Sequence, residues 1–263
     1  MQLSLYQSDT ASLIHDISYS FTSKNQLTRW INEARRNCAK RTGCIRRHLT
    51  GQSAFGAGAQ AGSLIPGAGQ PGQLPDSFPI AQQSTTQNTF QTIPGVERYP
   101  FKGFANPYLQ AQHAGCHEIL EVGTVSISWG GSPMPALAWL PWEDMQAYCR
   151  SYGIQVQNYP YYWSVLNDGT AGEVWLYPIP QQACYMEWDV YALPSPLYSD
   201  DDFDAVPDGF SDAVKFMAAE LVYLSSQKYL QAQLMENQFA DHLGIDRVSV
   251  DRGKTSNFYA TAF

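Results

Sequence analysis

The sequence predicts an α+β fold, with a helical core made of an N-terminal helix and a long C-terminal helix and an antiparallel β-sheet between them. Three observations carry this prediction: helical spacing of apolar residues toward both ends, strand-like alternation in the middle, and one Gly- and Gln-rich interruption. We expect five segments: an N-terminal segment with a basic helix (1–50), an extended low-complexity arm or loop (51–117), an antiparallel β region (118–206), a long helix packing on the first helix (207–243), and an extended C-terminal tail (244–263).

The first helix is predicted to begin after Ser23, whose hydroxyl can cap it while Gln26 reaches back. Gly43 is a suitable residue to end it. The inner stripe consists of Leu27, Ile31, Ala34 and Cys38. Basic residues on the outer side face solvent, an acidic neighbouring subunit or DNA phosphate, and the sequence leaves these three readings open.

Charge is distributed unevenly along the chain. Residues 24–47 hold eight basic residues against Glu33 alone, so this segment carries +7 and leaves −15 for the rest of a chain whose total is −8. Such asymmetry is typical of subunits that meet head to tail, or of a basic face docked on an acidic partner.

Residues 51–92 change sharply to Gly, Ala, Gln, Ser, Thr and Pro. A segment of this composition cannot bury enough apolar surface to offset the entropy of ordering it. We therefore expect residues 51–117 to form an extended arm or inserted loop that surrounding chains hold in place. Its spaced apolar anchors are Phe55, Leu64, Ile65, Phe78, Ile80 and Phe90.

Alternating and aromatic-rich runs predict strands at 118–129, 134–140 and 161–166, with a short helix at 142–151. Residues 173–177 and 184–191 are predicted to pair as a hairpin around the turn at 178–180.

The longest helical pattern follows Pro207. Its apolar stripe consists of Phe210, Val214, Met217, Leu221 and Leu224. The phase slips at Ser225 and Ser226 and resumes at Leu230, which we interpret as one long helix with a bend. The preceding Asp200–Asp202 run suits the positive end of that helix, an ion, or a basic surface of the next subunit.

No catalytic signature is present: the sequence lacks a Gly-x-Ser-x-Gly elbow and a phosphate-binding glycine loop between strand and helix. His113, Cys116 and His117 have ligand-like spacing, but no fourth ligand is close, so they are either a metal site or ordinary loop residues. We therefore expect no enzyme, no metal and no cofactor. Five cysteines without a Cys-x-x-Cys pair indicate reduced thiols assembled in a cytoplasm, and the absence of a long apolar run predicts no membrane contact.

Two blocks resemble the head-to-tail adaptor (head-completion, neck connector) proteins of tailed bacteriophages. The matching residues are Trp175–Pro180, Tyr191, Asp200–Asp202, Pro207 and Ala219–Tyr223, together with Arg29–Arg36. The resemblance implies a structural virion protein at the neck, forming a ring of about twelve copies that docks on the portal protein and meets a tail or nozzle protein. DNA would pass through its channel without specific binding.

Two sets of contact residues are expected from this role. The aromatic residues Phe258, Tyr259 and Phe263 are expected to bind the portal, unless they are only a frayed end. Contacts between subunits are expected at Arg29, Arg35, Arg36, Lys40, Asp200, Asp201 and Asp202. The alternatives are a stopper or tail-tube component, which would have more sheet and less long helix, and a soluble enzyme such as a cell-wall hydrolase.

Overall fold

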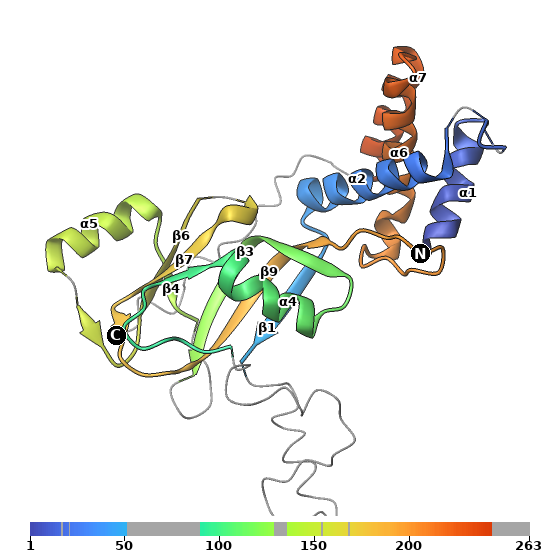
Figure 1. Ribbon diagram of the computed structural model, residues 1–263. Coiled ribbons are helices and arrows are strands. Elements are labelled where there is room, and N and C mark those ends of the chain that lie inside the picture. Colours follow the sequence, from blue (N-terminus) through green and yellow to red (C-terminus); the bar gives the residue numbers. More distant parts are fainter. Residues whose placement is uncertain are drawn as a thin grey trace, which may run out of the picture. The chain divides into compact units, whose positions relative to one another are not determined.

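The computed structural model describes residues 1–16, 18–20, 22–51, 90–128, 136–153, 155–167 and 169–243 (Figure 1). Helices and largely antiparallel sheets both occur, which confirms the α+β class. Two compact units divide the described residues: the first draws on Met1–Arg47, Leu109–Glu121 and residues 191–243, and the second on residues 48–51, 90–108 and 122–190.

Four helices dominate the first unit: α1 (Leu3–Leu13), α2 (Lys24–Thr42), α6 (Ser211–Ser225) and α7 (Tyr229–His242). A short helical turn, η4 (Asp208–Phe210), leads into α6. Helix α6 packs against the other three helices, so it is the centre of the bundle. The interior is apolar and includes Leu27, Ile31, Ala34, Val214, Met217, Ala218 and Phe239.

Helix α2 forms as the sequence predicts. The Ser23 hydroxyl accepts a hydrogen bond from the Gln26 backbone N–H at 3.3 Å, which satisfies one of the free donors of the first turn. Gly43 ends the helix in the left-handed conformation at φ 61°. The predicted inner stripe is buried, because these positions recur on the face turned toward α6 and α1.

The expected long C-terminal helix is instead a helical hairpin. Helix α6 ends at Ser225, and α7 begins at Tyr229 after Gln227 has adopted a left-handed φ of 59°. The helices are antiparallel, because Phe216 near the start of α6 stacks on His242 at the end of α7, with ring centroids 4.8 Å apart. The phase slip in the sequence therefore marks a reversal of the chain and not a bend.

A four-stranded sheet in the second unit has the order β2 (Arg98–Pro100), β7 (Glu173–Tyr177), β6 (Tyr162–Leu166), β4 (Ala138–Trp139). Strand β7 is antiparallel to both neighbours, while β4 runs parallel to β6. Helix α5 (Trp142–Tyr152) packs against β6. A small parallel pair consists of β5 (Val156–Gln157) and β8 (Ile179–Pro180), and a 3₁₀ turn, η3 (Gly169–Ala171), precedes β7.

The predicted hairpin of 173–177 with 184–191 is wrong. Strand β9 (Tyr185–Pro194) pairs instead with β1 (Arg46–Thr50) and β3 (Cys116–Ser128), in the order β1-β9-β3. Both edges of β7 are already occupied by β2 and β6, so β7 has no free edge for β9. The division between the two compact units falls within each of the strands β1, β3 and β9.

The extended arm or inserted loop expected for 51–117 is not found at residues 101–112, which are helical, or at 98–100, which form a strand of a sheet. These residues form β2, the π-helical turn η2 (Phe101–Ala105) and α4 (Asn106–Gln112). The aromatic side chains there find partners in the second unit: Phe90 and Phe104 both pack against the fully buried Trp188. Such ring contacts give Phe90 and the stretch from 98 to 112 their apolar burial. Residues 52–89 lie outside the described part of the chain.

Candidate interaction surfaces

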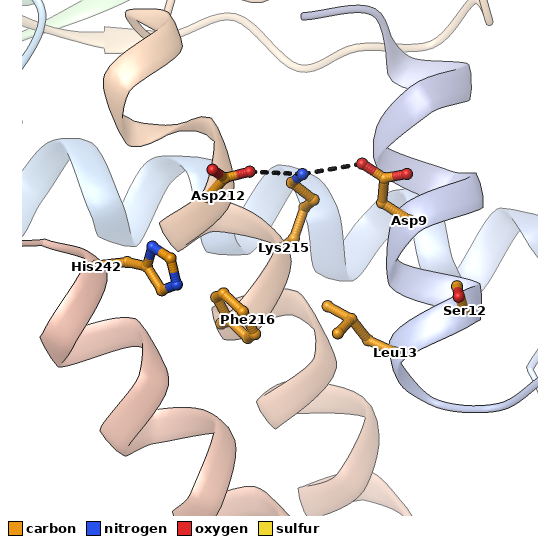
Figure 2. Close-up of a pocket in the computed structure, with 7 residues that line it drawn as sticks. All are labelled: Asp9, Ser12, Leu13, Asp212, Lys215, Phe216 and His242. Atoms are coloured by element: carbon orange, nitrogen blue, oxygen red, sulfur yellow. Dashed lines mark hydrogen bonds and ion pairs between the residues drawn. The ribbon is translucent and has the colours of Figure 1, made fainter.

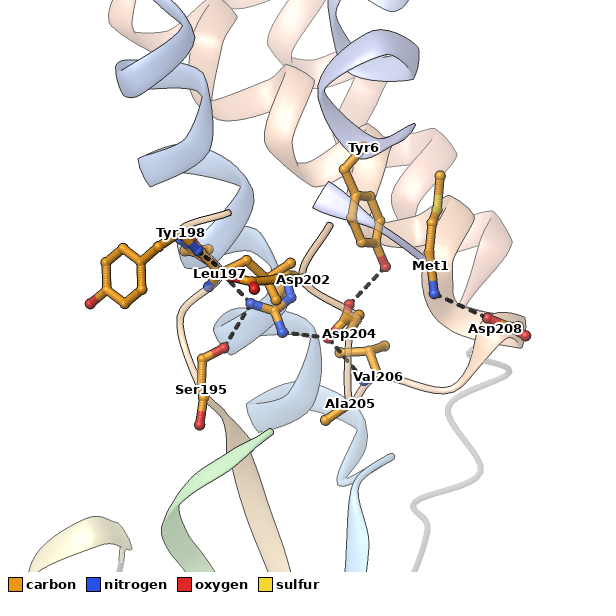
Figure 3. A network of polar contacts seen from close by, with 12 residues as sticks. Met1, Tyr6, Ser195, Leu197, Tyr198, Asp202, Asp204, Ala205, Val206 and Asp208 are labelled. Atoms are coloured by element: carbon orange, nitrogen blue, oxygen red, sulfur yellow. Dashed lines mark hydrogen bonds and ion pairs between the residues drawn. The ribbon is translucent and has the colours of Figure 1, made fainter. Parts of the chain in front are cut away.

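The loop between β9 and α6 is attached to α2 through one buried guanidinium (Figure 3). Arg35 donates hydrogen bonds to the Ser195 carbonyl at 2.9 Å, to the Asn32 side-chain oxygen at 2.8 Å and to the Asp204 carboxylate. The side chains of Arg35 and Asp204 are 1% and 0% exposed. Further hydrogen bonds to both partners offset much of the cost of burying this charge pair, although the buried Nε of Arg35 has no hydrogen-bond partner.

Asp204 has three different donors. Besides Arg35, the Tyr6 hydroxyl donates to its carboxylate at 2.8 Å and the Val206 backbone N–H at 3.0 Å. Burial, with the negative charge of Asp204 next, raises the pKa of Tyr6 far above its usual value, so this hydroxyl stays protonated and remains a donor. The network thereby joins α1, α2 and the loop into one rigid corner of the first unit.

The predicted acidic run lies on the same loop but serves it in different ways. Asp200 accepts a hydrogen bond from Lys24 at 2.7 Å, and both side chains are about half exposed. Asp202 accepts backbone N–H bonds from Ser199 and Tyr198, each at 2.8 Å, and these bonds lower its pKa. Asp201 is exposed. The run therefore stabilises its own loop, and Lys24 at the start of α2 contacts Asp200 within the same subunit.

The expectation that Arg35 contacts a neighbouring subunit is wrong. A side chain that is buried within its own subunit cannot contact a neighbouring one, and Arg35 is 1% exposed. The remaining basic residues of α2 do lie at the surface: Arg29 and Lys40 are exposed, and Arg36 is half exposed beside Glu118 at 3.0 Å. Sequence reasoning missed Tyr6, Asn32 and Asp204, because only the fold brings them to Arg35.

Among the described residues of the first unit, the most exposed large apolar side chains lie at two places. Tyr198 and Phe203, on the loop before α6, are 82% and 72% exposed. Around the α6–α7 connection, Tyr229, Leu230 and Leu234 are 67%, 81% and 56% exposed. Helix α6, whose 15 residues span roughly 22 Å, lies between the loop and the α6–α7 connection along the chain. We call them the loop patch (Tyr198, Phe203) and the hairpin patch (Tyr229, Leu230, Leu234).

A surface pocket of ≈ 400 Å³ opens where α1, α6 and α7 meet (Figure 2). Its lining residues are Asp9, Ser12, Leu13, Asp212, Lys215, Phe216 and His242. Lys215 lies between two carboxylates, 2.9 Å from Asp9 and 2.6 Å from Asp212. Burial lowers the pKa of Lys215, but the bonds to Asp212 and Asp9 outweigh it and the net shift is upward. Lys215 therefore stays protonated, and its ion pair with Asp9 ties α6 to α1.

The described residues contain no group of three or more His, Cys, Asp and Glu side chains arranged to hold a metal ion. Cys116 is buried and interacts with Arg47, while His117 contacts Gln110. Within the same residues, no helix has both the length and the hydropathy to cross a bilayer. Phe258, Tyr259 and Phe263 lie outside the part of the chain that the structure describes.

The fold and these surfaces define an α+β chain with exposed aromatic and aliphatic patches. Comparison with protein families is more specific: the family model described as SU10 adaptor protein matches residues 3–258, nearly the whole chain. The chain belongs to this family of structural bacteriophage head-to-tail adaptors. A search of curated proteins gives no match.

Proposed function

We propose that this chain is the subunit of an adaptor ring that docks on the portal protein and joins the DNA-filled capsid to the tail. It is assembled in the host cytoplasm, about twelve copies form the ring, and the ring lies in the neck of the virion. The observation that carries this proposal is the family match over residues 3–258. Tail or nozzle protein binds the side of the ring away from the portal, and DNA passes through the channel without specific binding.

The two apolar patches support a ring. Copies that meet head to tail use two different surfaces, and the contact closes into a ring when its rotation permits. The loop patch and the hairpin patch are such a pair, since each exposes large apolar side chains and they lie at opposite ends of α6. We assign both to contacts between copies, with the exposed Arg29, Arg36 and Lys40 of α2 facing the Asp200–Asp202 run of the next copy.

Ring formation has a direct test in substitutions of these patches. Leu230→Glu together with Leu234→Glu places carboxylates on the hairpin patch and should convert rings into single subunits, as measured by light scattering after size-exclusion chromatography. Gln181→Glu together with Gln182→Glu, a pair of exposed residues in the second unit and outside both patches, is the matched control and should leave the rings intact. Rings that persist in the double variant would remove the hairpin patch from the contact.

Portal binding is assigned to the aromatic C-terminal residues Phe258, Tyr259 and Phe263. Deleting residues 256–263 should leave a subunit with an unchanged circular dichroism spectrum that no longer co-sediments with purified portal rings. A triple substitution of the three aromatic residues to Ser should have the same effect, and Thr255→Ala should have none. Portal binding by the deleted chain would overturn this assignment.

Electron cryo-microscopy of the intact virion neck tests the whole proposal. The expected result is a ring of this chain seated directly on the portal. Density for this chain only below another ring would indicate a stopper or tail-tube component instead. A basic channel wall would overturn the proposed passage of DNA without specific binding, because clustered Lys and Arg bind phosphate whatever the sequence.

A further inference from the structure

The C-terminal turn of α2 brings two thiols together. Gly43 donates its backbone N–H to the Ala39 carbonyl at 2.8 Å while in the left-handed conformation. This helix ending brings the residue after the glycine back onto the last turn of the helix. Cys44 is the residue after the glycine, and Cys38 lies on the last turn of the helix. Their side chains hydrogen-bond each other. Both thiols are free in the structure.

The two thiols have different surroundings. Cys38 is buried and Cys44 is partly exposed. The Thr42 hydroxyl donates to the Cys38 carbonyl at 2.7 Å and accepts the Cys44 backbone N–H at 3.2 Å, which holds the turn in place. The Cys38 thiol, as hydrogen-bond donor, lowers the pKa of Cys44 to about 7, although burial and the nearby Asp204 carboxylate oppose this shift. Cys44 is therefore the thiol that solvent reaches first and that carries the thiolate.

We propose that Cys38 and Cys44 are a modification site: they form an intramolecular disulfide that locks the end of α2. With a small-molecule disulfide such as oxidised glutathione, the Cys44 thiolate attacks one sulfur and releases one glutathione thiolate, leaving a mixed disulfide. Cys38 then loses its proton and attacks the Cys44 sulfur, releasing the second glutathione. Two protein thiols are oxidised and one glutathione disulfide is reduced to two thiols.

The time at which the bond closes rests on the proposed function. A host cytoplasm keeps thiols reduced, whereas a released virion meets an oxidising medium. The bond is therefore absent during assembly and closes in the released particle, where it fixes a turn of the finished subunit. Closure in the purified chain but not in released virions would count against the virion location and leave the pairing itself intact.

Peptide mapping of the full chain tests the pairing. Trypsin cuts after Arg36, Lys40, Arg41 and Arg46, so the two cysteines fall in separate peptides, 37–40 and 42–46. After treatment of the purified chain with oxidised glutathione, mass spectrometry without reduction should find these two peptides linked. The intact chain should lose the mass of two hydrogens, and three of its five cysteines should still react with a thiol reagent in denaturant.

Variants separate the two steps. Cys38→Ser lacks the resolving thiol and should retain one glutathione on Cys44, whereas Cys44→Ser should take up none at either position. Cys149→Ser, a change in the second unit, should form the 37–40 to 42–46 link like the wild type. If a variant does not fold, the tryptic peptide map of the wild-type chain by itself tests the pairing of Cys38 with Cys44. Five unchanged thiols, glutathione that remains on wild-type Cys44, or a link to any other cysteine would overturn the proposal.

Discussion

Two helices of the first unit, α2 and α6, end with the same backbone conformation but with different residues. Gly43 follows α2 at φ 61° and Gln227 follows α6 at φ 59°. At α6 the Gln227 N–H bonds the Leu224 carbonyl at 3.0 Å and the Lys228 N–H bonds the Tyr223 carbonyl at 2.9 Å. At both ends a left-handed residue lets otherwise unpaired carbonyls of the last turn accept hydrogen bonds. Only at α2 is that residue a glycine, which can be recognised in the sequence.

The difference between Gly43 and Gln227 shows which interactions must stabilise each helix end. Glycine adopts the left-handed conformation without a steric penalty, whereas a residue with a Cβ pays roughly 1–2 kcal/mol. The end of α6 is therefore maintained by packing: α7 folds back on α6 and buries Ala232 and Phe239. Local sequence encodes the first ending, and contacts with another helix enforce the second.

The largest effect is expected where α2 is anchored to the loop before α6. Asp204→Ala leaves the buried Arg35 without its counter-ion and should reduce the free energy of unfolding by about 3–5 kcal/mol, measured by urea denaturation. The double change Arg35→Met with Asp204→Leu should recover most of that loss. Asp201→Ala, on the exposed part of the loop, is the control and should match the wild type.

Breaking the glycine ending of α2 is expected to cost less. In Gly43→Ala, the new Cβ would lie 3.1 Å from the Tyr191 ring and the residue would have an unfavourable φ, so we expect a loss of about 1–3 kcal/mol in urea denaturation. Gly95→Ala also has positive φ but meets nothing within 4 Å, so it should lose less. Equal losses would show that the contact with Tyr191 contributes nothing.

The opposite sign is expected at the end of α6. Gln227→Gly removes the left-handed penalty and should raise the free energy of unfolding by about 0.5–1 kcal/mol, after the greater freedom of glycine in the unfolded chain is taken into account. Gln233→Gly, in the middle of α7, should lower it by about 1 kcal/mol. Destabilisation by Gln227→Gly would contradict the account given for this ending.

The smallest effect is expected at the start of α2. Lys24→Ala breaks the exposed pair with Asp200 and should leave the urea midpoint unchanged within error, because water and salt screen such pairs. Both pairs join the same helix to the same loop, so the comparison with Asp204→Ala contrasts an exposed pair with a buried one whose carboxylate also accepts from Tyr6 and Val206. A clear loss in Lys24→Ala that disappears at high salt would show that the exposed pair also anchors the loop.

Much of the first helix could be predicted from the sequence. Ser23, Gln26 and Gly43 act within one turn of the helix ends, and the inner stripe needs only the 3.6-residue period. The burial of the candidate contact residues could not be predicted from the sequence. A count of charges cannot tell that Arg35 is desolvated while Arg29 is not, since that depends on which segments cover α2.

By itself the sequence determined the α+β class, helix α2 with both its ends, and the resemblance that the family match over residues 3–258 confirms. These properties depend on residues a few positions apart, or on motifs read in order. Only the tertiary structure decided that residues 211–242 form a hairpin, that β7 and β9 join different sheets, and that Arg35 pairs with Asp204. The reason is physical: free strand edges, burial of charge and helix reversal depend on segments that meet only after the chain has folded.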